Sequence, residues 1–408
     1  MTKKRFWWGR IGFHNLHPLK GRPRFWFHAA SVGEINGAVA PIIEVRRLYP
    51  KALIVLTVGT FHGFRFALSR FPPEVCVLPF PLDLPLVADR ALRFIEPDLF
   101  VGFESEYWPY LSGLLRAHGI PTIQLNARLS DRSASLYSKL KPLFSPIFKH
   151  FSYFAAKTEA DYRNAIKMGV CPEKAMVLGS SKYDSLAARA ASAKIHLWRD
   201  SLALASDDPV IVGGSLRGEE CLDLLRIFCR LRKNYPDLLG IFAPRHLGNI
   251  EVMRKWLDSR SLAYDLLSTL ISGRRTRSSQ IVLVDLMGVL FDLYALGDLI
   301  FCGGTLVPVG GHNIVEPVVW GKVVFYGPHV DKVIQEHKIL ESLGLGVKVE
   351  NTGELYSRWL DILRGDGLKV LKSREMVASE AIKRLGGVVS KQIELIENVV
   401  TRICPGGP

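Results

Sequence analysis

Carboxylates, basic side chains and glycine pairs gather in short clusters at the ends of predicted strands, and the densest cluster spans residues 301–317. It begins as the end of an apolar run at 299–302, which predicts a buried parallel strand. Two glycine pairs follow, and a helix is predicted to begin near Asn313. A strand, a glycine-rich loop and a helix start are typical of phosphate binding, because free backbone N–H groups and a positive helix end then face the anion. Alternatively, Asn313 and Glu316 only cap the helix and the glycines only turn the chain.

Carboxylates also follow two predicted strands of the first half. In Ser31-Val32-Gly33-Glu34, the last side chain would act as a general base towards a hydroxyl. On position alone, it more simply stabilises the helix dipole, by about 0.3–1 kcal/mol. In Glu104-Ser105-Glu106-Tyr107-Trp108-Pro109, two carboxylates beside a tryptophan are costly to bury without partners, which favours a functional role. First-turn acids of the next helix are the alternative, at equal weight.

Basic side chains occupy similar positions. Arg128 and Arg132, in the segment 126–133 after a predicted strand, suit bidentate binding of phosphate. The stretch 137–150 would extend a cationic, aromatic face towards a lipid or a phosphorylated acceptor, or form a solvated helix face. Lys182 follows another strand and suits the counter-charge of an anionic substrate. Arg245, after a strand that ends in Ala-Pro, would clamp a phosphate or carboxylate. His312 would donate to phosphate or, taken by itself, serve in capping or packing.

The elements that would carry these clusters alternate between strand and helix. Strands are predicted near 25–30, 52–58, 75–79, 98–103, 121–125, 152–156 and 175–178, and again near 210–215, 238–243, 281–284, 298–302 and 322–326. This alternation predicts two consecutive doubly wound, Rossmann-like domains with a cleft between them. The expected divisions are a basic aromatic arm at 1–24, an N-terminal domain at 25–185, a linker at 186–208, a C-terminal domain at 209–370 and a helix at 371–408.

The charge and composition of the chain restrict the kinds of molecule that it can bind. The chain has 408 residues and a net charge of +14, which points to nucleic acid, anionic lipid or phosphorylated small molecules. The arm 1–24 carries seven basic and no acidic residues, interleaved with Phe6, Trp7, Trp8 and Phe13. Such a segment suits an anionic membrane surface, or packs on its own domain. No RNA-binding motif supports a nucleic-acid partner. Six cysteines without a CxxC pair argue against zinc, and neither a transmembrane segment nor a signal peptide is predicted.

Six ordered motifs together resemble the Kdo (3-deoxy-D-manno-oct-2-ulosonic acid) transferases. They are Ser-Val-Gly-Glu, Glu-Ser-Glu-Tyr-Trp-Pro, Asn-Ala-Arg-Leu-Ser-Asp-Arg-Ser, Gly-Ser-Ser-Lys-Tyr-Asp, Ala-Pro-Arg-His and Gly-Gly-His-Asn-Ile-Val-Glu-Pro. The resemblance in order and spacing extends over about residues 5–390. The resemblance implies a GT-B fold and an inverting transfer of Kdo from CMP-Kdo to a lipid A precursor, without metal or cofactor. It also implies a peripheral enzyme on the cytoplasmic face of the bacterial inner membrane.

The resemblance also implies roles for single residues. Glu34 resembles the general base on the acceptor hydroxyl, with Ser31 and Gly33 beside it. Lys182 and one of Glu104 and Glu106 resemble the groups that stabilise the transition state, and the sequence does not decide between the two glutamates. The donor-binding segments are similar at Pro244, Arg245, Gly311, His312, Asn313, Ile314, Val315 and Glu316.

Three features depart from the family pattern. The usual N-terminal anchoring helix is replaced by the basic arm. The Met-Gly-Glu-Leu nucleotide segment has Val289 between Gly288 and Leu290, so only backbone contacts of that segment are expected. The Ser-Thr-His-x-Gly-Glu-Glu segment is one residue shorter, running from Ser215 to Glu220. Either Arg217 replaces the histidine as a cation, or the geometry of donor binding differs. Two rival functions therefore stay open: a GT-B enzyme that uses another nucleotide sugar, and a non-catalytic binding protein with a decayed site.

Overall fold

The computed structural model describes residues 2–11, 20–205, 208–273, 275–311 and 313–403. By internal contacts the chain divides into two compact units. Unit 1 comprises residues 1–185 and 385–408, and unit 2 comprises residues 186–384. Each unit is built on a seven-stranded sheet, and every strand pairing among the described residues is parallel. The predicted fold class, two Rossmann-like α/β domains, is confirmed.

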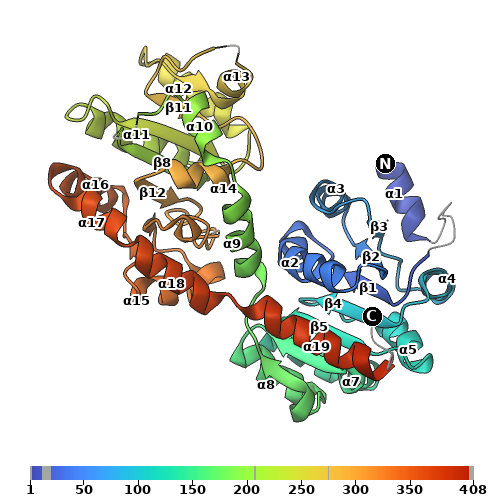
Figure 1. Cartoon of the computed structure of the whole chain (residues 1–408). Coiled ribbons are helices and arrows are strands. Elements are labelled where there is room, and N and C mark those ends of the chain that lie inside the picture. The colour runs from blue at the N-terminus through green and yellow to red at the C-terminus, as the bar shows by residue number, and fades with distance from the viewer. Residues whose placement is uncertain (1, 12–19, 206–207, 274, 312, 404–408) are drawn as a thin grey trace. The chain divides into compact units, whose positions relative to one another are not determined.

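The sheet of unit 1 has the strand order β3-β2-β1-β4-β5-β6-β7 (Figure 1). Its strands are β1 (Arg24–His28), β2 (Leu53–Val58), β3 (Val75–Pro79), β4 (Leu99–Phe103), β5 (Thr122–Ala127), β6 (Tyr153–Ala156) and β7 (Ala175–Val177). Its helices are α1 (Lys3–Arg10), α2 (Val32–Leu48), α3 (Phe61–Arg70), α4 (Pro85–Ile95), α5 (Pro109–Ala117), α6 (Asp131–Lys139), α7 (Lys141–His150), α8 (Glu159–Met168), the 3-10 turn η1 (Pro172–Lys174), the start of α9 (Lys182–Ser192) and α19 (Val388–Ile403).

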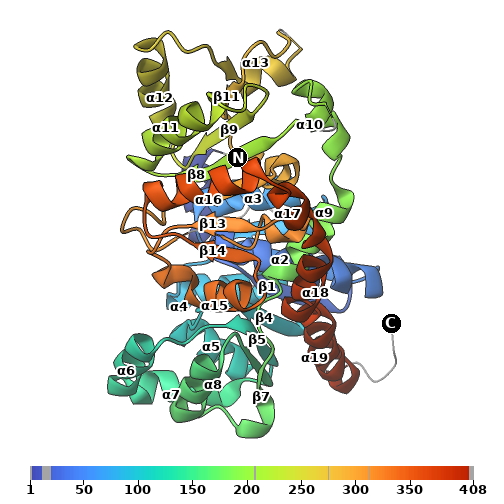
Figure 2. The same cartoon turned by 90° about the vertical axis from the view of Figure 1, so that its left-hand side faces the viewer.

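The sheet of unit 2 has the order β10-β11-β9-β8-β12-β13-β14. Its strands are β8 (Val210–Leu216), β9 (Leu239–Pro244), β10 (Asp265–Leu266), β11 (Ile281–Leu283), β12 (Leu299–Cys302), β13 (Val324–Tyr326) and β14 (Gly346–Lys348). Its helices are α10 (Ile195–Ser201), α11 (Glu220–Arg232), α12 (Asn249–Asp258), α13 (Leu267–Ile271), α14 (Leu290–Leu293), α15 (Ile334–Ser342), α16 (Thr352–Arg364), α17 (Gly367–Ser373) and α18 (Glu375–Leu385), with 3-10 turns η2 (Tyr294–Leu296), η3 (Val318–Trp320) and η4 (Asp331–Val333). Helices α11 and α16 pack side by side (Figure 2).

Several strands of both sheets are buried along their whole length, as expected where helices cover both faces of a sheet. The strands β2, β4 and β9 are buried at every position. Within unit 1 the last helix, α19, packs beside α2 (Figure 1). Its residues Ile396 and Val400 enter the same core cluster as Phe25 and Leu99. The end of the chain therefore completes the core of the unit in which the chain begins.

The segment 371–408, predicted as one helix, is interrupted in the structure. It contains the end of α17, then α18, then α19. Gly387, at φ +72°, ends the helical path just before α19, since the left-handed region is readily available only to glycine. Its N–H, together with that of Val388, donates to the Asp184 carboxylate. The backbone break is thus tied to the start of α9.

The N-terminal arm is partly a helix that packs on its own unit. Phe6 of α1 is fully buried and contacts Phe61 and Phe64, with ring centroids 5.7 and 5.4 Å apart. Trp7 and Trp8 are about half exposed, at 51% and 46%. Phe13, the fourth aromatic of the predicted arm, lies outside the described residues. The packing alternative therefore holds for Phe6, whereas membrane contact by the arm stays a prediction.

Candidate active site

The motif-bearing segments of unit 1 end at one edge of its sheet. Strands β1 and β4 are neighbours although they are not consecutive, so the strand order reverses between them. Ligands of such sheets bind beyond the carboxyl ends of the strands at that reversal. The segment 31–34 follows β1 and the segment 104–106 follows β4. The predicted acids therefore flank the position where a ligand is expected.

Glu34 sits in the first turn of α2 and is held there by its own helix start. Ser31 is the N-cap, its hydroxyl accepts from the Glu34 N–H, and the hydroxyl donates to Oε1 of Glu34 at 3.1 Å. The Ala30 N–H donates to Oε2 at 2.6 Å. Burial and, next, the negative charge of Glu106 raise the pKa of Glu34 to about 7, against the lowering effect of these hydrogen bonds. A carboxylate that changes charge near neutral pH suits a general base.

The carboxylate of Glu106 is held by hydrogen bonds to neighbouring side chains. Its Oε2 accepts from the indole N–H of Trp108 at 2.7 Å and lies 2.9 Å from Nε2 of the buried His28. Nδ1 of that imidazole faces the Thr57 carbonyl at 2.9 Å, an acceptor, so Nδ1 carries a proton. Burial is the largest influence on Glu106 and acts to raise its pKa. The hydrogen bond and charge of His28, the Trp108 N–H and the Arg10 charge outweigh it and lower the pKa.

Glu104 differs from Glu106 in its backbone and in its contacts. It has φ +56°, a left-handed conformation that costs a non-glycine residue free energy and persists where the surroundings impose it. Its carbonyl accepts from the Arg128 N–H and the Gln124 amide, which hold this turn against the end of β5. Among the described residues its carboxylate makes no hydrogen bond. Of the two acids that the sequence could not separate, Glu104 is the one whose carboxylate stays available.

A buried amide network ties the Lys182 segment to the same edge. Asn126, at φ +47° near the end of β5, accepts from the Ser181 N–H at 3.0 Å and from the Gln392 amide at 2.9 Å. The Ser181 hydroxyl in turn donates to the Gly37 carbonyl of α2 at 2.7 Å. Lys182 is the next residue and begins α9. The network thus positions Lys182 on the side of the sheet where α2 carries Glu34.

The remaining predicted residues of unit 1 are more exposed. Arg128 and Arg132, after β5 and in the first turn of α6, both have exposed side chains. Gly33 lies in the first turn of α2, where an added Cβ would meet only the Ser31 hydroxyl at 3.8 Å. This glycine is therefore not required by packing within unit 1.

The predicted donor residues of unit 2 also share one edge. Strands β11, β9, β8 and β12 are adjacent in that order, and the sequence order reverses between β8 and β12. Ser215 lies near the end of β8 at φ +54°. Pro244 ends β9, and the exposed Arg245 follows, with its N–H bonded to the Leu216 carbonyl at 2.8 Å. The segments around Ser215, Arg217 and Arg245 are therefore brought together, as their positions after strands predict.

The segment with the Val289 departure is held by a partner that the sequence did not single out. Gly288, at φ +86°, precedes the short helix α14, which begins at Leu290. Arg189 donates to the Gly288 carbonyl at 3.2 Å, pairs with Asp292 at 3.2 Å, and lies over the Phe291 ring at 4.3 Å. The backbone of this segment is thus braced independently of the side chain at position 289.

The predicted helix at Asn313 is wrong. Residues 314–317 form a turn that leads into η3. The reason is Pro317: a helix capped by Asn313 needs its first bond from the N–H of residue 317 to the Asn313 carbonyl, and proline has no N–H. The Glu316 N–H takes that carbonyl at 3.4 Å instead, and the Asn313 amide donates to Oε1 of Glu316 at 2.8 Å. Ile314 and Val315 are fully buried, and His312 lies outside the described residues.

The predicted free N–H groups of the glycine loop are not free. The N–H groups of Gly304, Thr305 and Leu306 all donate to the carboxylate of Glu220, at 2.6, 3.0 and 2.8 Å. Gly310 and Gly311, at φ +89° and +86°, turn the chain further along. The interpretation of residues 303–306 as a phosphate cradle is therefore corrected, because the anion in that cradle belongs to the chain itself.

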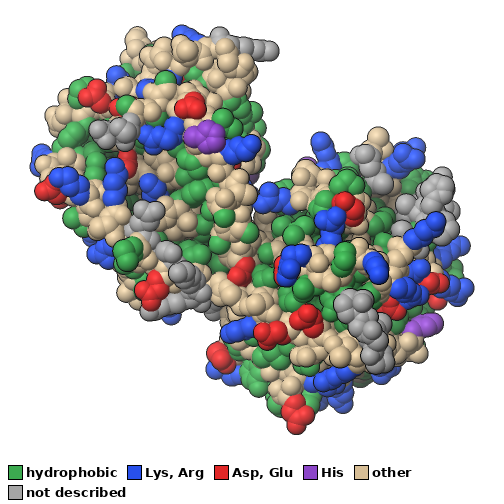
Figure 3. Space-filling view, viewed as in Figure 1, with side chains coloured by type: hydrophobic (Ala, Val, Ile, Leu, Met, Phe, Trp, Pro, Cys, Tyr) green, Lys and Arg blue, Asp and Glu red, His purple; other side chains and the backbone are tan. Residues whose placement is uncertain are grey.

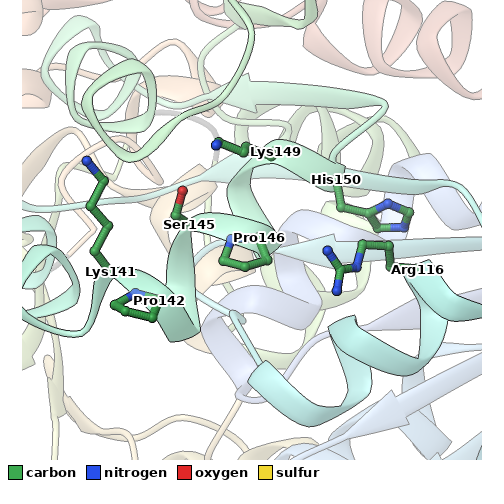
Figure 4. Close-up of a pocket in the computed structure, with 7 residues that line it drawn as sticks. All are labelled: Arg116, Lys141, Pro142, Ser145, Pro146, Lys149 and His150. Carbon is green, nitrogen blue, oxygen red and sulfur yellow. The ribbon is translucent and has the colours of Figure 1, made fainter.

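A basic groove lies elsewhere in unit 1, between α5 and α7 (Figure 4). Its volume is about 590 Å³, and its lining consists of Arg116, Lys141, Pro142, Ser145, Pro146, Lys149 and His150. Arg116 and His150 lie next to each other at one end, and Lys141 lies at the other (Figure 4). Burial, assisted by nearby cations, lowers the pKa of His150. On the face shown in Figure 3, Lys and Arg are spread among Asp and Glu and form no single patch.

Two further features of the structure bear on metal ions and membranes. Among the described residues, no group of three or more His, Cys, Asp and Glu side chains is arranged to hold a metal ion. Within the same residues, every helix is too short or too polar to span a bilayer.

Comparison with solved structures gives the class of fold. The UDP-GlcNAc 2-epimerase of Neisseria meningitidis, solved with UDP-GlcNAc, superimposes with a TM-score of 0.61 at 14% identity, covering 92% of this chain and 99% of that one. At this identity the likeness concerns the fold alone. Together with the two parallel sheets, it defines a protein of the GT-B fold class.

Comparison of sequences gives the family. Residues 5–185 match the family model described as 3-deoxy-D-manno-octulosonic-acid transferase (Kdo transferase). The chain is 28% identical over 400 residues to the 3-deoxy-D-manno-octulosonic acid transferase of Haemophilus influenzae, covering 96% of this chain and 91% of that protein. It is 31% identical over 338 residues to a bifunctional glycosyltransferase/methyltransferase of Fusobacterium nucleatum, of which it spans only about half, 52%. The N-terminal part of the chain thus matches the Kdo transferase family model, and the resemblance predicted from the six motifs is confirmed.

Proposed function

We propose that the protein transfers Kdo from CMP-Kdo to a lipid A precursor, with inversion at the anomeric carbon and without a metal ion. The observation that carries the proposal is the state of Glu34. A carboxylate with a pKa raised to about 7 stands at the sheet edge of unit 1, in a motif order that resembles named Kdo transferases over most of the chain.

The chemistry assigned to Glu34 is proton removal. The acceptor hydroxyl attacks the anomeric carbon of Kdo, the bond from that carbon to the CMP phosphate oxygen breaks, and the hydroxyl proton passes to Glu34. A base works best when its pKa lies near the working pH, because it is then both deprotonated and basic enough. Direct attack, with no covalent enzyme intermediate, inverts the anomeric configuration.

The charge that develops during transfer is assigned to two groups of unit 1. Glu104 is the acid that stabilises a positively charged sugar in the transition state, because its carboxylate makes no hydrogen bond among the described residues. Glu106 is bound to His28 and Trp108 and acts on the charge of Glu34 instead. Lys182, set in place through Ser181 and Asn126, supplies a cation for the Kdo carboxylate or the departing phosphate.

Unit 2 is assigned to the donor. Arg245 is exposed at the end of β9 and suits the phosphate of CMP, since a guanidinium binds phosphate oxygens in pairs. Ser215 and Arg217, the backbone of Gly288 to Leu290, and the segment from Gly311 through Asn313 to Glu316 complete the proposed contacts. The missing side-chain contact at Val289 then weakens donor binding without abolishing it, because Arg189 fixes that backbone.

The acceptor side of the proposal lies on α6 and α7. Leu136, Leu140 and Leu143 are exposed by 48–56%, and Lys139 and Lys141 stand among them. Apolar side chains among cations suit the surface of an anionic membrane, where the lipid acceptor resides. Together with the arm and the arginines Arg128 and Arg132, this surface would place the protein on the cytoplasmic face of the inner membrane, with no nucleic acid as partner.

The test is a transfer assay with CMP-Kdo and tetraacylated lipid A precursor in EDTA, followed by mass spectrometry. The wild type should add at least one Kdo, and parallel reactions with UDP- and GDP-sugars should add nothing. Glu34→Ala should bind CMP-Kdo and transfer none, whereas Glu44→Ala, a change at a half-buried position of the same helix, should keep activity. Transfer by Glu34→Ala would disprove the base. Multiple turnover with another nucleotide sugar and none with CMP-Kdo would disprove the donor.

A further inference from the structure

A buried carboxylate that has no cationic partner among the described residues lies in the core of unit 2. Glu220, the first residue of α11, is fully buried. Oε2 accepts from the N–H groups of Arg217 and Gly304 at 2.9 and 2.6 Å, and Oε1 accepts from those of Thr305 and Leu306. Among the described residues it forms no ion pair. Four backbone dipoles therefore hold the charge, as they would hold a bound anion.

These four donors come from two segments far apart in the chain. The Arg217 N–H belongs to the turn that follows β8, and the other three belong to the loop that follows β12. The two segments touch: a Cβ on Gly303 would lie 2.7 Å from both the Ser215 carbonyl oxygen and Cα of Leu216. Only glycine fits there, so the two backbones are in direct contact, and the Glu220 carboxylate bonds to both. We call this contact of residues 215–217 and 303–306 around Glu220 the joint.

The joint continues through Thr305 into the next strand. The Thr305 hydroxyl donates to the Cys302 carbonyl at 2.7 Å and accepts from the Gly327 N–H at 2.8 Å. The Thr305 carbonyl accepts from the His329 N–H at 3.0 Å. Further on, the Gly311 N–H bonds to the Gly304 carbonyl at 2.8 Å. Gly304 and Thr305, which Glu220 binds, therefore also bond to residues further along the chain. The conformation of residues 303–311 depends on these bonds.

We propose that Glu220 is a positioning residue for donor binding: its carboxylate acts as a built-in anion that sets both the Ser215–Arg217 turn and the loop leading to Asn313 and Glu316. The proposal rests on the assignment of these segments to the donor. Without the carboxylate, four buried N–H groups lose their acceptor, and each such loss is costly. The loop then leaves its position or takes an anion from solution.

The first test probes the carboxylate without any sugar nucleotide. In Glu220→Ala, sodium formate should raise the melting temperature in a saturable way, because formate can occupy the four N–H groups. Formamide, which has the same size but no charge, should not do so. Wild type and Glu219→Ala, which removes a neighbouring exposed charge, should show no formate-specific rise. An equal response to formate in all three proteins would overturn the idea of an anion-binding joint.

The second test links the joint to the donor. Glu220→Gln keeps the volume but turns an NH₂ group towards N–H donors, so the KM for CMP-Kdo should rise at least about tenfold while kcat and the acceptor KM change little. Formate should return the donor KM of Glu220→Ala towards the wild-type value. A fall in kcat with unchanged donor KM would overturn the positioning role. If the wild type shows no CMP-Kdo turnover, the proposed function fails, and the formate melting experiment still decides whether the joint exists.

Discussion

Glu34 and Glu220 look alike in the sequence, since each is an acid at the start of a helix that follows the first strand of its domain. In the structure they differ in what surrounds them. Glu34 receives one backbone N–H and one hydroxyl, and the charges of Glu106 and Glu104 oppose its own. Glu220 receives four backbone N–H groups. The same kind of position can therefore hold an acid beside other acids or fix it with backbone donors, and the surrounding charges and donors decide which.

The largest expected effect is on catalysis by Glu34. Glu34→Gln should lower kcat/KM for Kdo transfer by about 10²–10⁴-fold, the range for losing a general base. Glu44→Gln, at a half-buried position of α2 where the carboxylate pairs with Arg47, is the matched control and should stay within about twofold of wild type. If both variants were similarly active, Glu34 would not be a general base, and it would not differ in function from a structural acid such as Glu220.

The next effect is on stability, and it should have opposite signs at the two acids. Glu220→Gln should lower the free energy of unfolding by about 2–4 kcal/mol, because at least one buried N–H loses its acceptor. Urea unfolding at pH 8 measures this, with Glu219→Gln as control. If Glu220→Gln were as stable as wild type, the four hydrogen bonds to the carboxylate would contribute nothing to the free energy of unfolding.

Glu34→Gln should instead stabilise the protein at pH 8, by about 1–3 kcal/mol. The pKa of Glu34 is raised from 4.5 to about 7, so between these values the folded state binds more protons than the unfolded state. Wild-type stability therefore falls as pH rises through this window, and a glutamine, which cannot ionise, escapes that loss. The gain should shrink towards pH 4.5. A gain independent of pH would mean that packing, not charge, is responsible.

The smallest effect concerns Glu106. Removing its charge in Glu106→Gln should lower the pKa of Glu34, so the acidic limb of the kcat/KM profile should move to lower pH by up to about one pH unit. His28→Gln should move the limb less, because the Glu106 charge then remains. A shift to higher pH in Glu106→Gln would contradict the assigned repulsion.

Much of the fold and part of the site follow from local pattern. Apolar runs predict the strands of unit 1 and five strands of unit 2, but they miss the short edge strands β10 and β14. The reversal of strand order at β1/β4 and β8/β12 brings segments that follow strands to one edge, so Glu34, Glu104, Ser215 and Arg245 lie where their positions predict. The prediction of a helix at Asn313 is wrong, although Pro317, four residues further on, is a local signal against it.

The supporting contacts could not be predicted, because their partners are distant in sequence. Gln392 lies 266 residues from Asn126, and Glu220 lies 84 residues from Gly304. His28, within an apolar strand, reads as a core residue until Glu106 is seen beside it. Nothing in the spacing of these residues marks them as partners.

The titration of the Glu34 side chain itself tests the central claim most directly. Carboxyl ¹³C chemical shifts of wild type, compared with Glu34→Gln to assign the signal, give its pKa without any substrate. A midpoint near pH 7 that falls in Glu106→Gln is the predicted result. A midpoint near 4.5 that Glu106→Gln leaves unchanged would show that the fold does not prepare this acid for proton transfer.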